Sequence, residues 1–234
     1  NQARELDPKL LLATVAAQRG FTCLLGSRMD VDFRLGFFPR GVYLAKSMTR
    51  RSRKVFSILR QLGHEIVVWD EEALVTYTYP EIYYGRRLDE QTLGQVSHLF
   101  AWGPANVELF QKYPGYPGTP IHATGNPRGD LLRPELREFF AEEAAARRAQ
   151  HGEFLLLNTN FGHVNAFYPI LNLLQPPNAE GFREIGRAAV GMTRAYAEGR
   201  AAHKQTVLEA FLEMIPFLHE AFPALNLVIR PHPT

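Results

Sequence analysis

The chain has 234 residues, 46% of them hydrophobic, which is enough for one large domain or two smaller domains with separate cores. Its net charge of +2 is too balanced to indicate nucleic-acid binding, and its one cysteine, Cys23, excludes an internal disulfide framework. Because no apolar stretch approaches the ~20 residues of a membrane span and no secretory signal pattern opens the chain, we expect a cytoplasmic protein.

Helix and strand patterns alternate along the first 150 residues. A helix is predicted over 8–19, with Asp7 as its N-cap, and an apolar strand over 21–25 that would bury Cys23 in the core. Further strands are predicted at 41–45, 64–69, 97–102 and 121–124, and further helices at 52–62, 105–112 and 134–150. This alternation is typical of βαβ units around a parallel sheet, so the predicted fold class is α/β. We also expect a strand before Asn1.

A second series of elements follows residue 150. It has a strand at 154–157, helices at 182–200 and 203–221, and a terminal strand at 225–229. We therefore predict two domains, 1–150 and 151–234. Because two strands cannot bury both faces of a sheet, we expect the second domain to be truncated in this chain.

The terminal strand runs into Arg230-Pro231-His232-Pro233, where the prolines end the strand and hold Arg230 and His232 in a stiff loop. Open α/β sheets bind ligands at the carboxyl ends of their strands, and two donor groups there suit a phosphate. Amide and hydroxyl groups that could contact a nucleotide follow the other strand of this domain: Asn158, Thr159 and Asn160. The alternative is that the Pro-His-Pro turn only ends the strand.

Three acidic residues, Asp70, Glu71 and Glu72, follow the predicted strand 64–69. Carboxylates this close cannot all remain ionised cheaply, so we expect at least one to hold a proton and act as an acid or base. The alternatives are a solvated acidic loop, or Asp70 as the N-cap of a following helix.

A polar loop, 122–130, follows the strand at 121–124. Gly125 permits a close backbone approach, Pro127 stiffens the turn, and Arg128 and Asp130 place opposite charges close together. The loop could hold these charges in a cleft, or Arg128 and Asp130 could simply pair to close it.

A basic cluster, Arg50-Arg51-Ser52-Arg53-Lys54, opens the predicted helix at 52–62. The helix dipole disfavours cations at this end, so a contact with an anion or with membrane lipid is one interpretation. A solvated basic turn is the other.

Four segments together resemble the bacterial surface-carbohydrate biosynthesis proteins: Arg4-Glu5-Leu6-Asp7, residues 64–72, Thr124-Gly125-Asn126-Pro127-Arg128 with Asp130, and Arg230-Pro231-His232-Pro233. These proteins are similar to the two-domain GT-B glycosyltransferases that include the retaining β-Kdo transferases of capsule and lipopolysaccharide assembly. The resemblance spans nearly the whole chain, and the order and spacing of the motifs carry it.

The resemblance implies a GT-B-like fold with two Rossmann-like domains and parallel sheets. Two motifs also resemble those of bacterial sialyltransferases, an acidic pair before glycine and a His-Pro, although Ala73 follows Glu71-Glu72 here. By position, Glu71 or Glu72 would face the acceptor hydroxyl, and His232 with Arg230 would hold the donor phosphate. Asp130 would be the nucleophile of a retaining double displacement.

The expected function is transfer of Kdo or a related ulosonic acid from a CMP-activated donor to a glycan or lipid-linked glycan acceptor. The resemblance implies neither a cofactor nor a bound metal. We expect a cytoplasmic enzyme, with contact to the inner membrane through the basic cluster and no nucleic-acid partner. The alternatives are a nucleotide-sugar 2-epimerase, which has a segment similar to Gly125–Asp130, and a non-catalytic scaffold module of the same fold.

Overall fold

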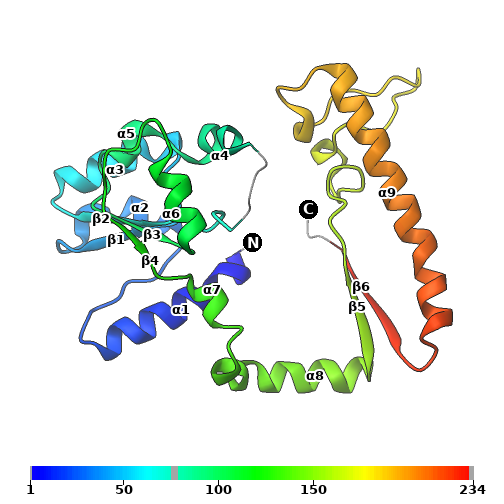
Figure 1. The fold of residues 1–234 in the computed structure, drawn as a ribbon, viewed down its shortest axis with the longest axis horizontal. Helices are drawn as coiled ribbons and strands as arrows, with labels where there is room; N and C mark the ends of the chain where they lie inside the picture. Colours follow the sequence, from blue (N-terminus) through cyan, green and yellow to red (C-terminus); the bar gives the residue numbers. More distant parts are fainter. Residues whose placement is uncertain (1, 75–78, 232–234) are drawn as a thin grey trace. The chain divides into compact units, whose positions relative to one another are not determined.

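The computed structural model describes residues 2–74 and 79–231. The chain divides into two compact units, 1–139 and 140–234, so the division falls within the segment 134–150 that we expected to be the last helix of the first domain. The elements of unit 1, which Figure 1 labels, are α1 (Gln2–Gln18), α2 (Arg28–Phe33), η1 (Leu35–Phe37), β1 (Val42–Ala45), η2 (Arg50–Ser52), α3 (Arg53–Gln61), β2 (Glu65–Trp69), α4 (Pro80–Arg87), α5 (Glu90–Leu93), β3 (His98–Ala101), α6 (Pro104–Gln111), β4 (Ile121–Ala123) and α7 (Pro127–Asp130).

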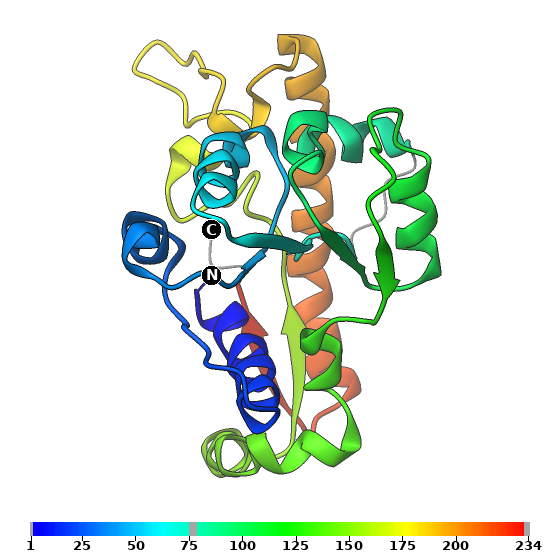
Figure 2. The same cartoon turned by 90° about the vertical axis from the view of Figure 1, so that its left-hand side faces the viewer.

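Unit 1 contains a four-stranded parallel sheet in the order β1-β2-β3-β4. When consecutive strands of a parallel sheet are neighbours and their crossover connections are all right-handed, the connecting helices lie on the same face of the sheet. Accordingly, α3, α5 and α6 lie on one side of the sheet, and α1 and α7 lie on the other (Figures 1 and 2). The mixed α/β class with a parallel sheet is therefore confirmed, and this arrangement is compatible with a Rossmann-like topology.

The core of unit 1 lies between the sheet and these helices. Ile66 and Val68 of β2 are fully buried, as is Leu99 of β3, and Phe56 and Leu59 of α3 pack into the same cluster. Each such side chain stabilises the fold by roughly 2 kcal/mol. This packing holds the carboxyl ends of the strands in fixed positions.

Unit 2 is built around two parallel strands. Its elements are α8 (Ala141–His151), β5 (Phe154–Asn158), η4 (Pro169–Leu171), η5 (Arg187–Ala189), α9 (Arg194–Ala221) and β6 (Asn226–Arg230), and η3 (Pro134–Phe140) precedes them. β5 pairs with β6 from Phe154↔Asn226 to Asn158↔Arg230. A small apolar cluster of unit 2 forms around Leu173 and Ala197. Of the helices in the described parts of the chain, none is long and apolar enough to cross a membrane.

The segment 21–25 is not a strand, so this prediction was wrong. It has no regular secondary structure, with Phe21 67% and Leu24 62% exposed, and Cys23 is exposed rather than in the core. Within the described residues, no segment pairs with the outer edge of β1, so this apolar run has no ladder partner. A short apolar run alone does not distinguish a strand from a loop.

Helix boundaries differ in three places. α1 begins before Asp7, which is therefore not its N-cap, and includes Pro8. The predicted helix 134–150 is a 3₁₀ segment followed by α8. One helix, α9, replaces the two predicted at 182–200 and 203–221, and it begins only at Arg194, where Thr193 caps it by accepting from the Tyr196 N–H, 3.3 Å away.

Candidate functional site

Asp70 directly follows β2 and is completely buried. Its carboxylate pairs with the Arg87 guanidinium and accepts a hydrogen bond of 2.5 Å from the Tyr83 hydroxyl. Its backbone oxygen accepts a 2.7 Å hydrogen bond from the indole of Trp102. Burial alone would lower the pKa of Arg87, but the hydrogen bond and charge of Asp70 outweigh it, so the pKa lies above its ordinary value. Asp70 therefore anchors the end of β2.

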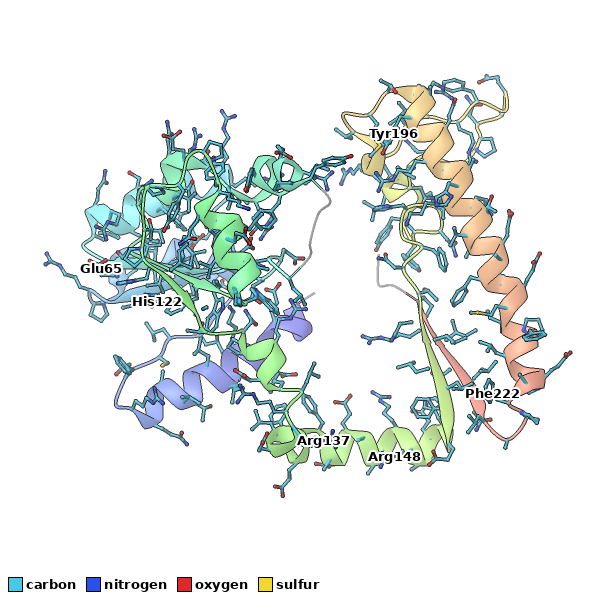
Figure 3. The ribbon with its side chains drawn as sticks, in the orientation of Figure 1. Glu65, His122, Arg137, Arg148, Tyr196 and Phe222 are labelled. Carbon is cyan, nitrogen blue, oxygen red and sulfur yellow. The ribbon has the colours of Figure 1, made fainter. Side chains whose placement is uncertain are left out.

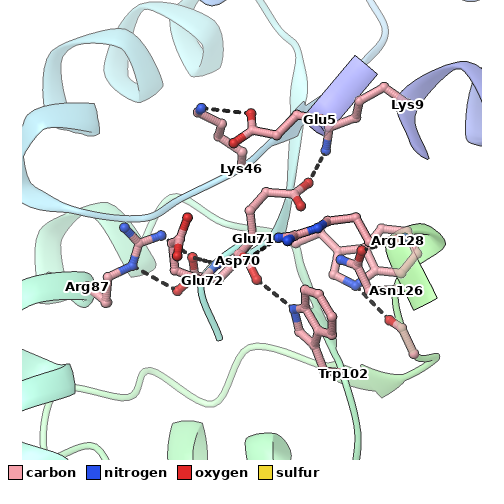
Figure 4. Close-up of polar contacts among 12 residues, drawn as sticks. Glu5, Lys9, Lys46, Asp70, Glu71, Glu72, Arg87, Trp102, Asn126 and Arg128 are labelled. Atoms are coloured by element: carbon pink, nitrogen blue, oxygen red, sulfur yellow. Dashed lines mark hydrogen bonds and ion pairs between the residues drawn. The ribbon is translucent and has the colours of Figure 1, made fainter. Parts of the chain in front are cut away.

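Glu71 turns away from Asp70. Its side chain is only 5% exposed and points toward α1, where Lys9 forms an ion pair with Oε1 (Figure 4). Its backbone N–H donates to the carbonyl of Lys46, just after β1, over 3.3 Å. The side chain of Lys46 pairs with Glu5 over 2.9 Å. Glu71 is thus fixed by residues from two other elements.

Glu72 is half-buried and lies on the Arg87 side of this turn with Asp70 (Figure 4). Its charge contributes to the raised pKa of Arg87. The three acidic residues therefore do not form one cluster, because Arg87 balances Asp70 and Lys9 balances Glu71. We expected at least one carboxylate to hold a proton because three like charges lie close together. The two cations reduce this repulsion between the carboxylates.

The loop after β4 joins the same edge of the sheet. The indole of Trp69 donates to the Gly125 carbonyl over 2.8 Å, and Asn126 caps the short α7 by accepting from the Arg128 N–H over 3.0 Å. The Arg128 guanidinium donates to the backbone oxygen of Glu71 over 3.1 Å and lies 5.7 Å from the ring centre of Trp102. These contacts tie the segments after β2, β3 and β4 together.

Arg128 and Asp130 do not pair, so the alternative in which these two residues close the loop is wrong. Asp130 pairs instead with Arg133 over 3.0 Å, and its side chain is 37% exposed. One helical turn separates these partners, which places them on one face, whereas residues two apart point in different directions. Asp130 lies beside an apolar hollow lined by α1 and Trp69.

Three buried side-chain atoms among the described residues have no hydrogen-bond partner: Glu71 Oε2, Asn106 Nδ2 and Asn126 Nδ2. Their residues follow β2, β3 and β4, which are adjacent strands of the sheet. Glu71 and Asn126 come within three residues of the ends of β2 and β4, and Asn106 lies in α6, which follows β3. Because buried polar atoms normally have partners, one acceptor and two donors here indicate a site for a polar ligand.

In unit 2, the predicted phosphate-contacting residues lie together where β5 and β6 end. Asn158 pairs in register with Arg230, and the Thr159 N–H donates to the Arg230 carbonyl over 3.1 Å. Arg230, Asn158 and Asn160 are exposed, and Thr159 is half-buried. His232 lies outside the described residues.

The basic cluster is partly structural. Arg53 pairs with Asp89, the N-cap of α5, and this hydrogen bond, together with those from Thr92, lowers the pKa of the Asp89 carboxyl to about 2. Arg50, Arg51 and Lys54 remain exposed.

Two exposed histidines, His98 and His122, lie 3.0 Å apart on β3 and β4. His122 is on the same side of unit 1 as Glu65, the first residue of β2 (Figure 3). Over residues 2–74 and 79–231, no group of three or more histidine, cysteine, aspartate or glutamate side chains is arranged to hold a metal ion.

Several residues of this site were not predicted from the sequence. Lys9 and Arg87 reach the acidic turn from helices, and Asn106 lies just inside α6. Asn106 comes four residues after the predicted strand 97–102. Its position near the carboxyl end of a strand is the sequence signal that could have identified it. In comparisons with protein-family models, curated proteins and solved structures, nothing matched this chain.

Proposed function

We propose that this chain is part of a GT-B glycosyltransferase of surface-polysaccharide assembly. It transfers Kdo or a related ulosonic acid from a CMP-activated donor to a glycan acceptor. The resemblance of the sequence motifs supports the class of reaction. The observation that carries the proposal is the set of three unpartnered polar atoms on Glu71, Asn106 and Asn126.

These three atoms complement a sugar. Hydroxyl groups both donate and accept, so the amides of Asn106 and Asn126 can donate to sugar oxygens while Glu71 Oε2 accepts from a hydroxyl. Lys9 on the other oxygen of Glu71 balances its charge and fixes its direction. The proposal therefore assigns the acceptor to unit 1.

Glu71 acts as the general base in this proposal. Oε2 of Glu71 takes the proton from the acceptor hydroxyl. At the same time the oxygen of this hydroxyl forms a bond to the anomeric carbon of the donor, and the bond between that carbon and the phosphate oxygen of CMP breaks. Glu72 lies on the Arg87 side of the turn, so its role is secondary. Asp130 takes part only if the reaction retains configuration through a covalent intermediate.

The donor is assigned to unit 2. The guanidinium of Arg230 offers charge-assisted hydrogen bonds to a phosphate, and Asn158, Thr159 and Asn160 offer amide and hydroxyl groups beside it. His232 follows in the same stretch of sequence. This placement follows the rule that parallel sheets bind ligands at the carboxyl ends of their strands.

Calorimetric titration of the chain with CMP, UDP, GDP and CDP tests the donor assignment. We expect CMP to bind most tightly and Arg230→Ala to weaken it about ten- to hundredfold, which is the worth of one charge-assisted hydrogen bond. Arg148→Ala is the matched control, because Arg148 is an exposed cation of α8 (Figure 3). Equal affinity for CMP in wild type and Arg230→Ala would contradict the assignment.

Incubation with activated sugars separates the remaining alternatives. An epimerase would invert UDP-N-acetylglucosamine without an acceptor, whereas the proposed transferase needs an acceptor and a CMP-linked sugar. A scaffold module would turn over neither substrate.

A further inference from the structure

Two exposed histidines lie side by side on neighbouring strands of unit 1. Phe100 of β3 is the ladder partner of His122 of β4, and alternate residues of a strand point to the same face of a sheet, so His98 shares the face of His122. Nδ1 of His98 is 3.0 Å from Nε2 of His122, and the ring centres are 5.1 Å apart. Because the two histidines are 24 residues apart in sequence, no local ligand spacing reveals the pair.

The distance between the two nitrogens suits a shared metal ion. Two metal–nitrogen bonds of about 2.05 Å, with an angle of about 90° to 109° at the metal, separate the nitrogens by about 2.9 to 3.4 Å. The separation in the structure lies within this range. Both rings are exposed, and the outer torsion of a histidine side chain is broad, so rotation of the rings can direct both lone pairs to one point.

The charges beside the pair are balanced. Glu65, the first residue of β2, is on the same side of unit 1 as His122 (Figure 3). Hydrogen bonds from Ser97 and Arg60 lower the pKa of the Glu65 carboxyl, and the nearby charges of Arg60 and of His98 act in the same direction. The ionised carboxylate offsets the charge of Arg60, which would otherwise repel a metal ion.

The pair also joins two strands of unequal support. β4 has three residues and lies at the edge of the sheet, where β3 is its neighbour among the described strands. It leads into Gly125, whose carbonyl accepts from the Trp69 indole, and into Asn126, the cap of α7. A bond between the side chains of β3 and β4 would therefore hold the strand from which this polar loop starts.

We propose that His98 and His122 form a two-histidine site for a divalent transition-metal ion, which clamps β4 to β3. Imidazole suits Zn²⁺, Cu²⁺ and Ni²⁺, whereas Mg²⁺ and Ca²⁺ prefer oxygen ligands. Each ring keeps its proton on the nitrogen that does not face the ion. Two protein ligands leave the other coordination positions to water, so the site is open and the ion exchangeable.

Calorimetric titration of the chain with Zn²⁺ measures this binding. We expect the tightest-bound Zn²⁺ to be lost in both His98→Gln and His122→Gln, and Mg²⁺ not to bind at the same concentrations. Both side chains are exposed, so the variants should fold, which circular dichroism checks. His203→Gln is the matched control, because His203 is an exposed histidine of α9, and it should bind like wild type. A wild-type chain that binds no Zn²⁺, or undiminished binding by either variant of the pair, would overturn the site.

Hydrogen exchange tests the clamp separately from the binding. The N–H groups of Thr124 and Gly125, just after β4, both donate to the Ala101 carbonyl of β3. With free Zn²⁺ at ten times its Kd, exchange through an opening that separates the two strands should slow by about tenfold in wild type. The same Zn²⁺ should leave exchange in His98→Gln unchanged. Bound Zn²⁺ without slower exchange of these amides would refute the clamp.

Discussion

Arg87→Leu should destabilise unit 1 strongly, because it leaves a buried carboxylate without its cation. Asp70 is completely buried, and Arg87 is the partner that the structure shows for its charge. Removing one partner of a buried ion pair costs about 3–5 kcal/mol. The Arg87 side chain is 21% exposed and the Tyr83 hydroxyl still donates to Asp70, so we expect the lower limit of about 3 kcal/mol.

Urea unfolding followed by tryptophan fluorescence measures this loss in unit 1 alone. Both tryptophans of the chain, Trp69 and Trp102, belong to this unit. With a slope of about 2 kcal/mol/M, the unfolding midpoint should fall by about 1.5 M. Arg86→Leu is the control, because Arg86 is exposed on the same helix, and its midpoint should stay within about 0.3 M of wild type. Equal midpoints for the two variants would refute the anchoring role of Asp70.

Three further predictions concern other parts of the chain. The lowered pKa of Asp89, about 2, means that its ionised form stabilises the fold above the ordinary carboxyl pKa and that this stability is lost as pH falls toward 2. Asp89→Asn should therefore flatten the fall in the urea midpoint between about pH 4 and pH 2, and an unchanged pH profile would contradict the pairing with Arg53. Thr193→Ala removes the N-cap of α9 and should cost about 1 kcal/mol, measured by circular dichroism, with Thr206→Ala within the helix as comparison. If transfer proceeds through a glycosyl-enzyme, mass spectrometry with donor and a poor acceptor should find the adduct on Asp130, and an adduct elsewhere would remove Asp130 from this role.

The strands of unit 1 were predicted well because buried parallel strands are short, continuous apolar runs. The runs at 41–45, 64–69, 97–102 and 121–124 each contain an observed strand, from β1 to β4. The run at 21–25 has the same composition but lacks a neighbour to pair with. A strand depends on its partner as well as on its own residues, and this dependence is not visible in a local pattern.

Helix limits were predicted less well because neighbouring contacts can extend a helix past a local signal. Asp7 and Pro8 have the pattern of a helix start, yet α1 begins earlier, and Glu5 in its extra turn pairs with Lys46. In unit 2, the predicted break near residue 201 is absent, since alanines there favour a continuous α9.

The candidate site was predictable where it follows strand ends in the sequence. Glu71 was selected for this reason, and Asn126 lies within the polar loop that was singled out. Lys9 and Arg87 were missed because each reaches the turn from a helix, 62 and 17 residues away from its partner. Which of three adjacent carboxylates remains available depends on these distant cations, so the sequence alone could not separate Glu71 from Asp70 and Glu72.

The most direct test of the account is the rate of sugar transfer by Glu71→Gln. Transfer from CMP-linked Kdo to a glycoside acceptor is measured for wild type, Glu71→Gln and Glu72→Gln, together with the affinity of each for CMP. We predict that Glu71→Gln lowers kcat by roughly 10²-fold while CMP affinity is unchanged, and that Glu72→Gln has a smaller effect. In the whole enzyme, turnover by Glu71→Gln at the wild-type rate would contradict the account.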